Sequence, residues 1–372
     1  MKISDIQTPA LLLDQGKVAA NTTAMTRRLQ AHGVNLRPHM KTAKSIDVAR
    51  LALAGNFGGV TVSTLKEAVY FLGHGVTDIV YAVCIQPSKL DVAAGLKANG
   101  ADLKVITDNV SVARAIADHG DAFEVLIEID CGEHRTGISP DDPDVMEIAS
   151  ILAASEHASL AGVMTHGGHS YQCRGEAEIQ QVAIAERDAA VSAAERLRAG
   201  GHDCAIVSVG STPTATYAED LTGVTEARPG VFVFYDLFQL GLGVCEIDNL
   251  ALSVVASVIS HRRDTGQILI DAGGLALSKD RSTGALDEDL GFGQICDARS
   301  GEPVKGLVVA GVHQEHGQIN VSDEAMFDRL PVGAKVRVLP NHACMTAAAY
   351  GEYHVIDGAD DVVAKWSRCN GW

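Results

Sequence analysis

The chain has 372 residues, 47% of them hydrophobic, which is enough for one large domain or two smaller ones with real cores. Its formal net charge is −17, and so acidic a protein has no general attraction for phosphate backbones or anionic lipids. We therefore expect no nucleic acid and no membrane among its partners. No apolar run approaches the roughly 20 residues that span a bilayer, and the eight cysteines contain no CxxC pair, so we expect a reduced, cytoplasmic protein.

Between about residues 34 and 240, short β-branched runs alternate with amphipathic segments. The predicted strands are Val34–His39, Gly59–Ser63, Asp78–Val83, Leu103–Thr107, Phe123–Asp130, Leu160–Thr165, Ala205–Val209 and Gly223–Phe234. The predicted helices include Ser63–Gly73, Ser88–Gly100, Asn109–Gly120 and Glu176–Ala199. Apolar strands joined by helical crossovers indicate a parallel sheet, and eight such units favour a closed barrel. We predict an α/β fold with a (β/α)8 TIM-type barrel over residues 15–245.

The pattern changes after about residue 246. Runs such as ALSVVASVISHR, GQILIDAGG and KVRVLPNHAC are strand-like and are separated by turns without long helical crossovers. This predicts a mostly antiparallel β domain over residues 246–372. We expect the N-terminal segment 1–14 to join this domain, because the run Thr8–Leu13 precedes the first helix of the barrel.

The stretch RPHMKTAKS contains two lysines directly after the first predicted strand of the barrel. The ends of barrel strands carry catalysis, because the loops that follow them surround one open mouth. Lys41 falls at this position, and a lysine held in a desolvated mouth loses proton affinity and becomes able to form imines. Lys44 falls further along, in the predicted helix, and is expected to be an ordinary surface lysine.

Later strands of the barrel also end in polar side chains. EIDCGEHRTG contains Arg135, THGGHSY contains His166, His169 and Tyr171, VSVGSTPT contains Gly210, Ser211 and Thr212, and FVFYDL contains Tyr235. Glycine N–H groups and hydroxyls at a helix start suit a phosphate, although a plain helix N-cap uses the same residues. A phosphate cradle opposite a strand-end lysine points to pyridoxal 5′-phosphate (PLP).

The second domain contains PNHAC, in which His342 and Cys344 are two residues apart. On a strand this spacing puts both side chains on one face, and imidazole with thiolate suits zinc. Two protein ligands leave open positions for water or substrate, as a catalytic metal requires. A structural zinc site would need two further ligands, and none is local in sequence.

These motifs together resemble one family. TPALLLD, RPHMKTAKS, VSTLKEA, EIDCGEHRTG, THGGHSY, VSVGSTPT, EARPGVFVFYD and PNHAC are spread over nearly the whole chain. In this order they are similar to the fold-type III, alanine racemase-like PLP enzymes that a metal activates. These are D-threonine aldolase, D-serine dehydratase and D-threo-3-hydroxyaspartate dehydratase.

The resemblance implies a role for each candidate residue. Lys41 would form the covalent link to PLP, Arg135 would lie close to the ring, and His342 with Cys344 would bind a divalent metal such as Zn, Mn or Mg. Tyr171, Gly210, Ser211, Thr212 and Tyr235 would hold the cofactor. The resemblance also implies a homodimer with shared active sites and a small D-β-hydroxy amino acid as substrate.

Two reactions remain open, because aldol cleavage and dehydration share these residues and differ in where a base stands. His166 or His169 would be the base for the substrate hydroxyl, and two imidazoles at one strand end favour D-threonine aldolase. The alternative is a D-serine or D-threo-3-hydroxyaspartate dehydratase. A racemase would need no HxC pair, and a non-catalytic PLP-binding protein would consist of the barrel alone.

Overall fold

The computed structural model describes residues 1–372. The chain forms two compact units, one made of residues 1–22 and 231–370 and the other of residues 23–230 with residues 371–372. Helix α1 (Gln15–Ala31) carries the chain from the first unit into the second. The expected domains, 15–245 and 246–372, divide the chain at a later residue.

The unit of residues 23–230 is built on a sheet of eight parallel strands. These are β2 (Asn35–Leu36), β3 (Val60–Val62), β4 (Asp78–Tyr81), β5 (Asp102–Thr107), β6 (Phe123–Ile129), β7 (Ala158–Thr165), β8 (Ile206–Val209) and β9 (Glu226–Ala227). The spatial order is β2-β9-β8-β7-β6-β5-β4-β3, and a parallel bridge between His39 and Thr61 joins the chain after β2 to β3. The predicted (β/α)8 barrel is therefore confirmed, with β2 and β9 shorter than expected.

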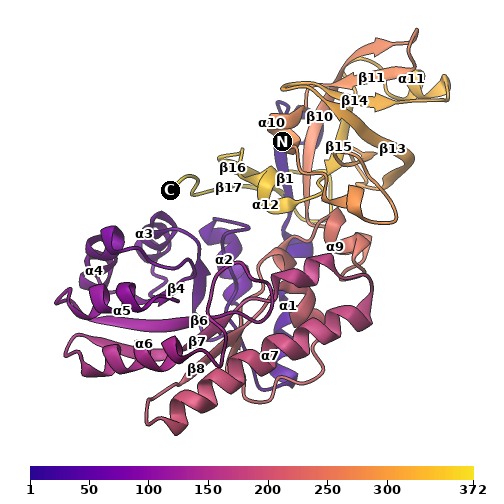
Figure 1. Ribbon diagram of the computed structural model, residues 1–372. Helices are drawn as coiled ribbons and strands as arrows, with labels where there is room; N and C mark the ends of the chain where they lie inside the picture. The colour runs from indigo at the N-terminus through magenta and orange to yellow at the C-terminus, as the bar shows by residue number, and fades with distance from the viewer. The chain divides into compact units, whose positions relative to one another are not determined.

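Helices cover the outside of this barrel (Figure 1). They are α2 (Ile46–Leu53), α3 (Leu65–Gly73), α4 (Leu90–Ala98), α5 (Val110–Ala117), α6 (Pro143–Ala154), α7 (Glu176–Ala199) and α8 (Thr212–Tyr217), with short 3-10 turns η2 (Pro87–Lys89) and η3 (Gly168–Gln172). Several begin at a capping side chain, as when the Asn109 side chain accepts the N–H groups of Ser111 and Val112. The strands beneath are buried on both faces, which explains why they read as continuous apolar runs.

A buried ion cluster ties the short strand β2 to its neighbours. The Arg37 guanidinium donates from Nε to Glu226 Oε2 (2.7 Å) and from Nη1 to Asp78 Oδ1 (2.8 Å). Removing one partner from such a buried pair typically costs about 3–5 kcal/mol, because the other charge is left uncompensated. The cluster therefore fixes the strand from which RPHMKTAKS emerges.

The other unit is a mostly antiparallel sheet of nine strands, as predicted. Its strands are β1 (Ala10–Asp14), β10 (Leu252–Arg262), β11 (Gln267–Ile270), β12 (Gln294–Asp297), β13 (Pro303–Val312), β14 (Gly317–Asn320), β15 (Lys335–Leu339), β16 (Glu352–Ile356) and β17 (Ala364–Ser367). Strands β10, β11, β14, β13, β12 and β15 pair in a closed ring, and β1 lies between β10 and β16.

Short helices connect these strands. They are α9 (Leu237–Gly241), α10 (Gly274–Leu277), α11 (Ala325–Arg329) and α12 (Ala343–Ala347), with 3-10 turns η1 (Ile3–Asp5), η4 (Val231–Val233), η5 (Ile247–Asn249) and η6 (Ser282–Ala285). A core cluster joins the N-terminal segment to the sheet, with Ile3 and Ile6 packed beside Leu12, Val255 and Ile356. Apolar burial of this kind is what holds residues 1–14 in the unit.

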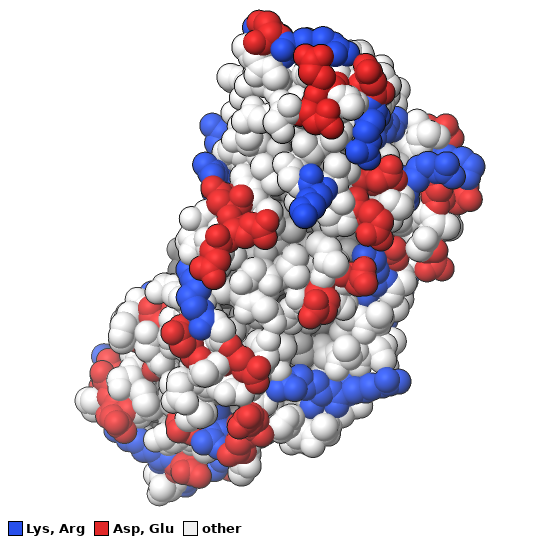
Figure 2. All heavy atoms as spheres, turned by 90° about the vertical axis from the view of Figure 1, so that its right-hand side faces the viewer, with Lys and Arg blue, Asp and Glu red and all other residues white.

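The surface carries charges of both signs. Figure 2 shows Lys and Arg side chains interspersed with Asp and Glu side chains over the face turned to the viewer. None of the helices is both long enough and apolar enough to cross a bilayer. All eight cysteines are free thiols.

Candidate active site

Lys41 lies in a turn whose backbone is held on both sides. The Met40 N–H donates to the Thr61 carbonyl (2.8 Å), and the Lys41 N–H donates to Nδ1 of His39 (3.4 Å). Met40 and Thr42 are fully buried, whereas Lys41 itself is exposed. The turn therefore fixes the Lys41 backbone, while the residue itself reaches solvent.

Lys44 differs from the surface lysine that the sequence predicted. Its ammonium group lies 3.1 Å from Oε1 of Glu67, a fully buried carboxylate, and only 18% of its side chain is exposed. Glu67 also accepts the N–H of Ser63, just before α3. The prediction of a helix at Lys44 was also wrong, because this residue lies in a turn with φ of +48° and α2 begins at Ile46. Lys44 is a structural partner of the neighbouring helix.

A buried imidazole (His39), a half-buried imidazole (His166) and a buried guanidinium (Arg228) lie near Lys41. Burial, with the positive charges of Lys41 and Arg228, holds the pKa of His39 well below its usual value. Burial, with the charges of Lys41 and Arg135, lowers the pKa of His166 to about 3. Both imidazoles are therefore neutral at pH 7. The charges of Lys41 and Arg135 thus both act on the His166 imidazole, and a shared active site of these three residues stays a prediction.

Arg228 is a component of this region that the sequence analysis missed. Its Nε donates to Ser208 Oγ (2.7 Å), and its Nη2 donates to the carbonyl of Thr165. The side chain is buried and interacts electrostatically with Glu226, Glu186 and other carboxylates. It supplies a fixed positive charge among the ends of β7, β8 and β9.

The segment THGGHSY follows β7 and places its two histidines differently. His166 donates from Nδ1 to the Gly210 carbonyl (2.9 Å), which leaves Nε2 as the acceptor nitrogen. His169 lies in η3, and its Nδ1 is buried without a hydrogen-bond partner. Tyr171 belongs to the same turn and is half-buried. A buried polar atom without a partner indicates a place where a ligand donor or acceptor fits.

Arg135 stands on the loop after β6 and is half exposed. Its Nη1 lies 3.5 Å from Glu133 Oε1, and its Nη2 lies 4.0 Å from Glu128 Oε1. Glu128 also accepts the hydroxyl of Thr136 (2.9 Å) and the thiol of Cys84 (3.0 Å). Two carboxylates therefore lie within ion-pair distance of the Arg135 guanidinium.

Cys84, Asp108 and Glu128 offer three possible metal-ligand atoms within 4.8 Å of one another. Burial, with the charge of Glu128, raises the pKa of the Cys84 thiol, so this sulfur keeps its proton and donates it to Glu128. Metals bind the thiolate, not the thiol. We read this group as a hydrogen-bonded cluster.

The loop Gly210–Thr212 after β8 is an N-cap as well as a candidate cradle. Ser211 Oγ accepts the Thr214 N–H and caps α8, and the Ser211 N–H donates to Thr214 Oγ1 (3.0 Å). The Gly210 N–H donates to Glu186 Oε1 (3.0 Å). The expectation of free N–H groups at Gly210 and Ser211 was therefore wrong, because helix capping and Glu186 use them.

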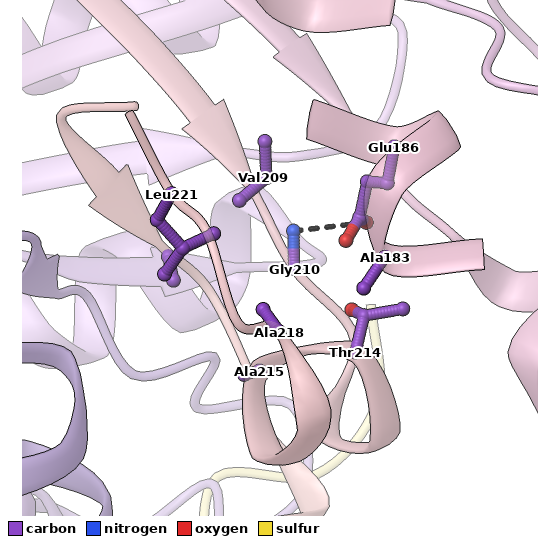
Figure 3. Close-up of a pocket in the computed structure, with 9 residues that line it drawn as sticks. Ala183, Glu186, Val209, Gly210, Thr214, Ala215, Ala218 and Leu221 are labelled. Carbon is purple, nitrogen blue, oxygen red and sulfur yellow. Dashed lines mark hydrogen bonds between the residues drawn. The ribbon is translucent and has the colours of Figure 1, made fainter. Parts of the chain in front are cut away.

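Glu186 is the second buried group that the sequence analysis missed. Figure 3 shows its carboxylate, on α7, pointing at the Gly210 N–H beside Thr214. The same oxygen accepts the Gly167 N–H (2.5 Å), so one carboxylate joins the loops after β7 and β8. A cavity of about 10 Å³ adjoins it, at the lower limit for a single water. Burial raises the pKa of Glu186, while the N–H groups of Gly167 and Gly210 oppose that shift.

Glycine is required at Gly210 because the chain passes close to other backbone there. A Cβ at this position would lie 2.6 Å from the Arg228 N atom, and φ is +132°. Gly230 is similarly close to the lysine turn, since its Cβ would lie 3.1 Å from the His39 carbonyl oxygen. The two glycines let β8, β9 and the lysine turn approach one another.

In the other unit, Tyr235 precedes α9 and is buried, with φ of +47°. The next residue, Asp236, caps α9 by accepting the Gln239 N–H on Oδ1 (3.0 Å). Its Oδ2 accepts the Ala343 N–H (2.9 Å), so this buried carboxylate also holds the start of α12. Burial raises the pKa of Asp236 to about 6.

His342 and Cys344 lie at the start of α12, not on a strand as the sequence suggested. His342 is the N-cap residue and Cys344 is in the first turn. The two side chains nevertheless meet, because the His342 ring hydrogen-bonds the Cys344 side chain. His342 Nδ1 lies 2.8 Å from Asp280 Oδ2. Partial burial disfavours the charged ring, but Asp280 and Cys344 outweigh it and raise the pKa of His342 to about 11.

The residues of each unit fit the group expected there. The barrel mouth offers an exposed lysine amine, a hydroxyl-bearing loop, a buried cation and the unpartnered Nδ1 of His169. PLP requires an amine for its aldehyde and polar groups for its phosphate and ring. In the β unit, an imidazole with one nitrogen tied to a carboxylate lies beside a thiol, which is the usual setting of a zinc-binding histidine.

Comparisons with known proteins agree with this geometry. Residues 13–237 match the family described as alanine racemase, N-terminal domain, and residues 251–356 match the putative serine dehydratase domain. D-threo-3-hydroxyaspartate dehydratase of Delftia sp. (strain HT23) is 44% identical over 375 residues, which cover 99% of this chain and 98% of that protein. Its solved structure superposes with a TM-score of 0.97 over 100% of both chains.

Two further relatives are more distant. D-serine dehydratase of Dictyostelium discoideum is 30% identical over 396 residues, covering 100% of this chain and 98% of that protein. D-threonine aldolase from Filomicrobium marinum has a TM-score of 0.83 at 26% identity, covering 98% and 96% of the two chains.

The barrel, the strand-end lysine and the antiparallel β unit define a fold-type III PLP-dependent enzyme related to alanine racemase. Within that class, the chain belongs to the family of D-threo-3-hydroxyaspartate dehydratase and D-serine dehydratase, and it is a PLP-dependent lyase.

Proposed function

We propose that this chain is a dehydratase of D-β-hydroxy amino acids that uses PLP and a divalent metal, with D-threo-3-hydroxyaspartate as its preferred substrate. The observation that carries this proposal is the 44% identity to D-threo-3-hydroxyaspartate dehydratase over 99% of the chain. The substrate would lose water across Cα and Cβ, and hydrolysis of the resulting enamine would give oxaloacetate and ammonia.

PLP, when bound, supplies an electron sink for a bond broken at the substrate Cα. Lys41 would hold the cofactor through its amine and, once released, would accept the Cα proton. Arg135 would lie near the ring, and Tyr171 and Tyr235 would line the pocket. The loop of Gly210, Ser211 and Thr212 would hold the phosphate, chiefly through hydroxyl groups, since Gly210 and Ser211 use their N–H groups within the chain.

A divalent metal, when bound, supplies a Lewis acid for the β-hydroxyl group. His342 would bind it through Nε2, because Nδ1 already contacts Asp280, and Cys344 would bind it as thiolate. The pair of imidazole and thiolate favours zinc over magnesium. One solved structure of a D-threo-3-hydroxyaspartate dehydratase is a cysteine-to-alanine variant described as being in the metal-free form, which supports a metal-binding role for a cysteine.

Dehydration is preferred here over the aldol cleavage that the two histidines of THGGHSY suggested. Aldol cleavage needs a base for the substrate hydroxyl, and the pKa of His166 is lowered to about 3, mainly by burial. Such an imidazole is a weak proton acceptor at neutral pH. D-threonine aldolase activity remains the second candidate, favoured by His169, whose Nδ1 has no partner in the chain.

One assay separates the two reactions. The enzyme, loaded with PLP and Zn²⁺ or Mn²⁺, is incubated with D-threo-3-hydroxyaspartate, D-serine and D-threonine, with the L-enantiomers as controls. Dehydration of the first substrate is expected to give oxaloacetate and ammonia in equal amounts. Glycine with glyoxylate from hydroxyaspartate, or glycine with acetaldehyde from threonine, would instead establish an aldolase.

The resemblance also leads us to propose a homodimer with shared active sites in the cytoplasm. Sedimentation velocity of the PLP-loaded protein tests the assembly, and a monomer at micromolar concentration would contradict it.

A further inference from the structure

We propose that Asp280 is a positioning residue for the metal, which orients the His342 ring so that Nε2 is presented to the ion. The inference rests on the proposed function, because it requires His342 and Cys344 to bind a divalent metal. Asp280 has no local sequence signal for this role, since it precedes His342 by 62 residues.

The Asp280 carboxylate is fixed at both oxygens. Its Oδ2 lies 2.8 Å from Nδ1 of His342, and its Oδ1 accepts the N–H of Ser282 (2.8 Å). Only 24% of the side chain is exposed. A carboxylate held in this way presents one oxygen to the imidazole without reorganisation of the loop.

The backbone around Asp280 is joined to the residue before His342. Asn341 is buried, and its Nδ2 donates to the carbonyls of Asp280 (3.1 Å) and Gly291 (2.7 Å). Its Oδ1 accepts the hydroxyl of Thr283 (3.1 Å). The loop that contains Asp280 and the turn that contains His342 are thus held together by three hydrogen bonds in addition to the contact between Asp280 and His342.

This arrangement has a specific chemical consequence. A carboxylate that accepts the Nδ1 proton of histidine keeps that proton on Nδ1, so Nε2 is the nitrogen that exchanges its own proton for a metal, and the carboxylate makes that nitrogen more basic. Loss of such a partner typically weakens metal binding by about 10–100-fold. The dehydration chemistry would then depend on Asp280 although this side chain touches neither substrate nor metal.

The test measures metal binding directly. Mn²⁺ is titrated into the PLP-loaded, metal-free enzyme and free Mn²⁺ is followed by electron paramagnetic resonance, with Co²⁺ absorption as a second probe of the thiolate ligand. Asp280→Ala is expected to raise the Mn²⁺ dissociation constant about 10–100-fold and to shift the Co²⁺ spectrum. Asp280→Asn keeps the shape of the side chain and is expected to weaken binding less.

Asp287 provides the matched control, since it lies exposed in the same loop and Asp287→Asn should bind Mn²⁺ like the parent enzyme. The PLP absorbance and the thermal midpoint should stay unchanged in Asp280→Asn. If Asp280→Ala does not fold, Asp280→Asn decides, and a Mn²⁺ dissociation constant above that of the parent enzyme is then the expected result. Unaltered Mn²⁺ affinity in the folded Asp280 variants would overturn this inference alone. Failure of the parent enzyme to bind Mn²⁺, Co²⁺ or Zn²⁺ would overturn the metal site and this inference together.

Discussion

Glu186 allows a quantitative test of how the barrel mouth is held together. Its carboxylate accepts the N–H groups of Gly167 and Gly210, at 2.5 and 3.0 Å, and the site is fully enclosed. Glu186→Ala leaves both amide donors buried without an acceptor. Each unsatisfied donor costs about 1–3 kcal/mol, so we expect a loss of about 2–6 kcal/mol in the free energy of unfolding.

Glu186→Gln should be much milder. The glutamine oxygen can still accept both N–H groups, and burial already raises the pKa of Glu186, which means that its charged form is disfavoured there. We expect a loss of about 1 kcal/mol, the order of a charge-assisted contribution to a hydrogen bond. Urea unfolding followed by circular dichroism, with the midpoint and slope compared among variants, measures both values.

Glu186→Ala also tests whether the loop of Gly210, Ser211 and Thr212 holds the phosphate of PLP. Glu186 joins the loop of His166 and His169 to the loop of Gly210, so Glu186→Ala should weaken the binding of PLP more than that of pyridoxal, which lacks the phosphate. Glu195, exposed on the same helix, gives the control Glu195→Ala. Equal urea midpoints for the Glu186→Ala and Glu195→Ala proteins would refute the structural argument, and equal losses of PLP and pyridoxal affinity would refute the role in phosphate binding.

Three further predictions concern the cofactor, the metal and pH. Lys41→Ala should abolish the near-visible absorbance of bound PLP, and survival of that band would show that another amine holds the cofactor. Chelation should remove activity while the band persists, and activity that resists chelators would count against a metal role. The free energy of unfolding should fall as the pH drops below 6.5. His39 and His166 bind protons in the unfolded chain at that pH, whereas their lowered pKa values keep them neutral in the folded chain. The largest effect is about 1.4 kcal/mol per pH unit for each imidazole. Asp236, with its pKa raised to about 6, stabilises the folded chain as the pH falls from 6 to 4 and so opposes this loss. Urea midpoints of the parent and His166→Gln proteins at pH 7, 6 and 5 measure the contribution of His166.

The barrel was predictable because its signals are local. Each buried parallel strand is a continuous apolar run, and Asn109 stands at the start of a predicted helix, where its side chain accepts N–H groups. The helix Glu176–Ala199 was predicted to the residue for the same reason, since a long amphipathic pattern ends at a glycine pair. The lengths of β2 and β9 were overestimated, because apolar composition does not show where pairing stops.

The prediction that the HxC pair lies on a strand was wrong, and the sequence contained the reason. Pro340 directly follows β15 and lacks an N–H group, so the strand ends at Leu339 and α12 begins at Ala343. His342 and Cys344 still meet, because the first turn of a short helix also brings nearby side chains together. The proximity that the pair predicted is thus found in a different secondary structure, and the metal site stays a prediction.

The groups that the sequence analysis missed are charged residues in the interior. Arg228, Glu186 and Asp280 each depend on partners that are distant in the chain, and charge composition alone assigns such residues to the surface. Glu186 did carry a local signal, since it falls on the buried stripe of α7 with Val182 and Ala190. An acidic residue on an apolar stripe requires a buried partner, and this is the observation that would have identified it.

The choice between dehydration and aldol cleavage depends on the two histidines after β7. With its pKa near 3, His166 is about four units less basic than a base matched to neutral pH, which corresponds to roughly 5 kcal/mol of lost proton affinity. Any aldol cleavage would therefore depend on His169, whereas dehydration needs no base at the substrate hydroxyl. His169→Gln should abolish glycine formation from D-threonine if the chain is an aldolase, and should leave most of the oxaloacetate formation from D-threo-3-hydroxyaspartate if it is a dehydratase. Loss of oxaloacetate formation in a His169→Gln protein that retains PLP would show that this imidazole serves dehydration itself, and the premise that dehydration needs no base at the substrate hydroxyl would fail.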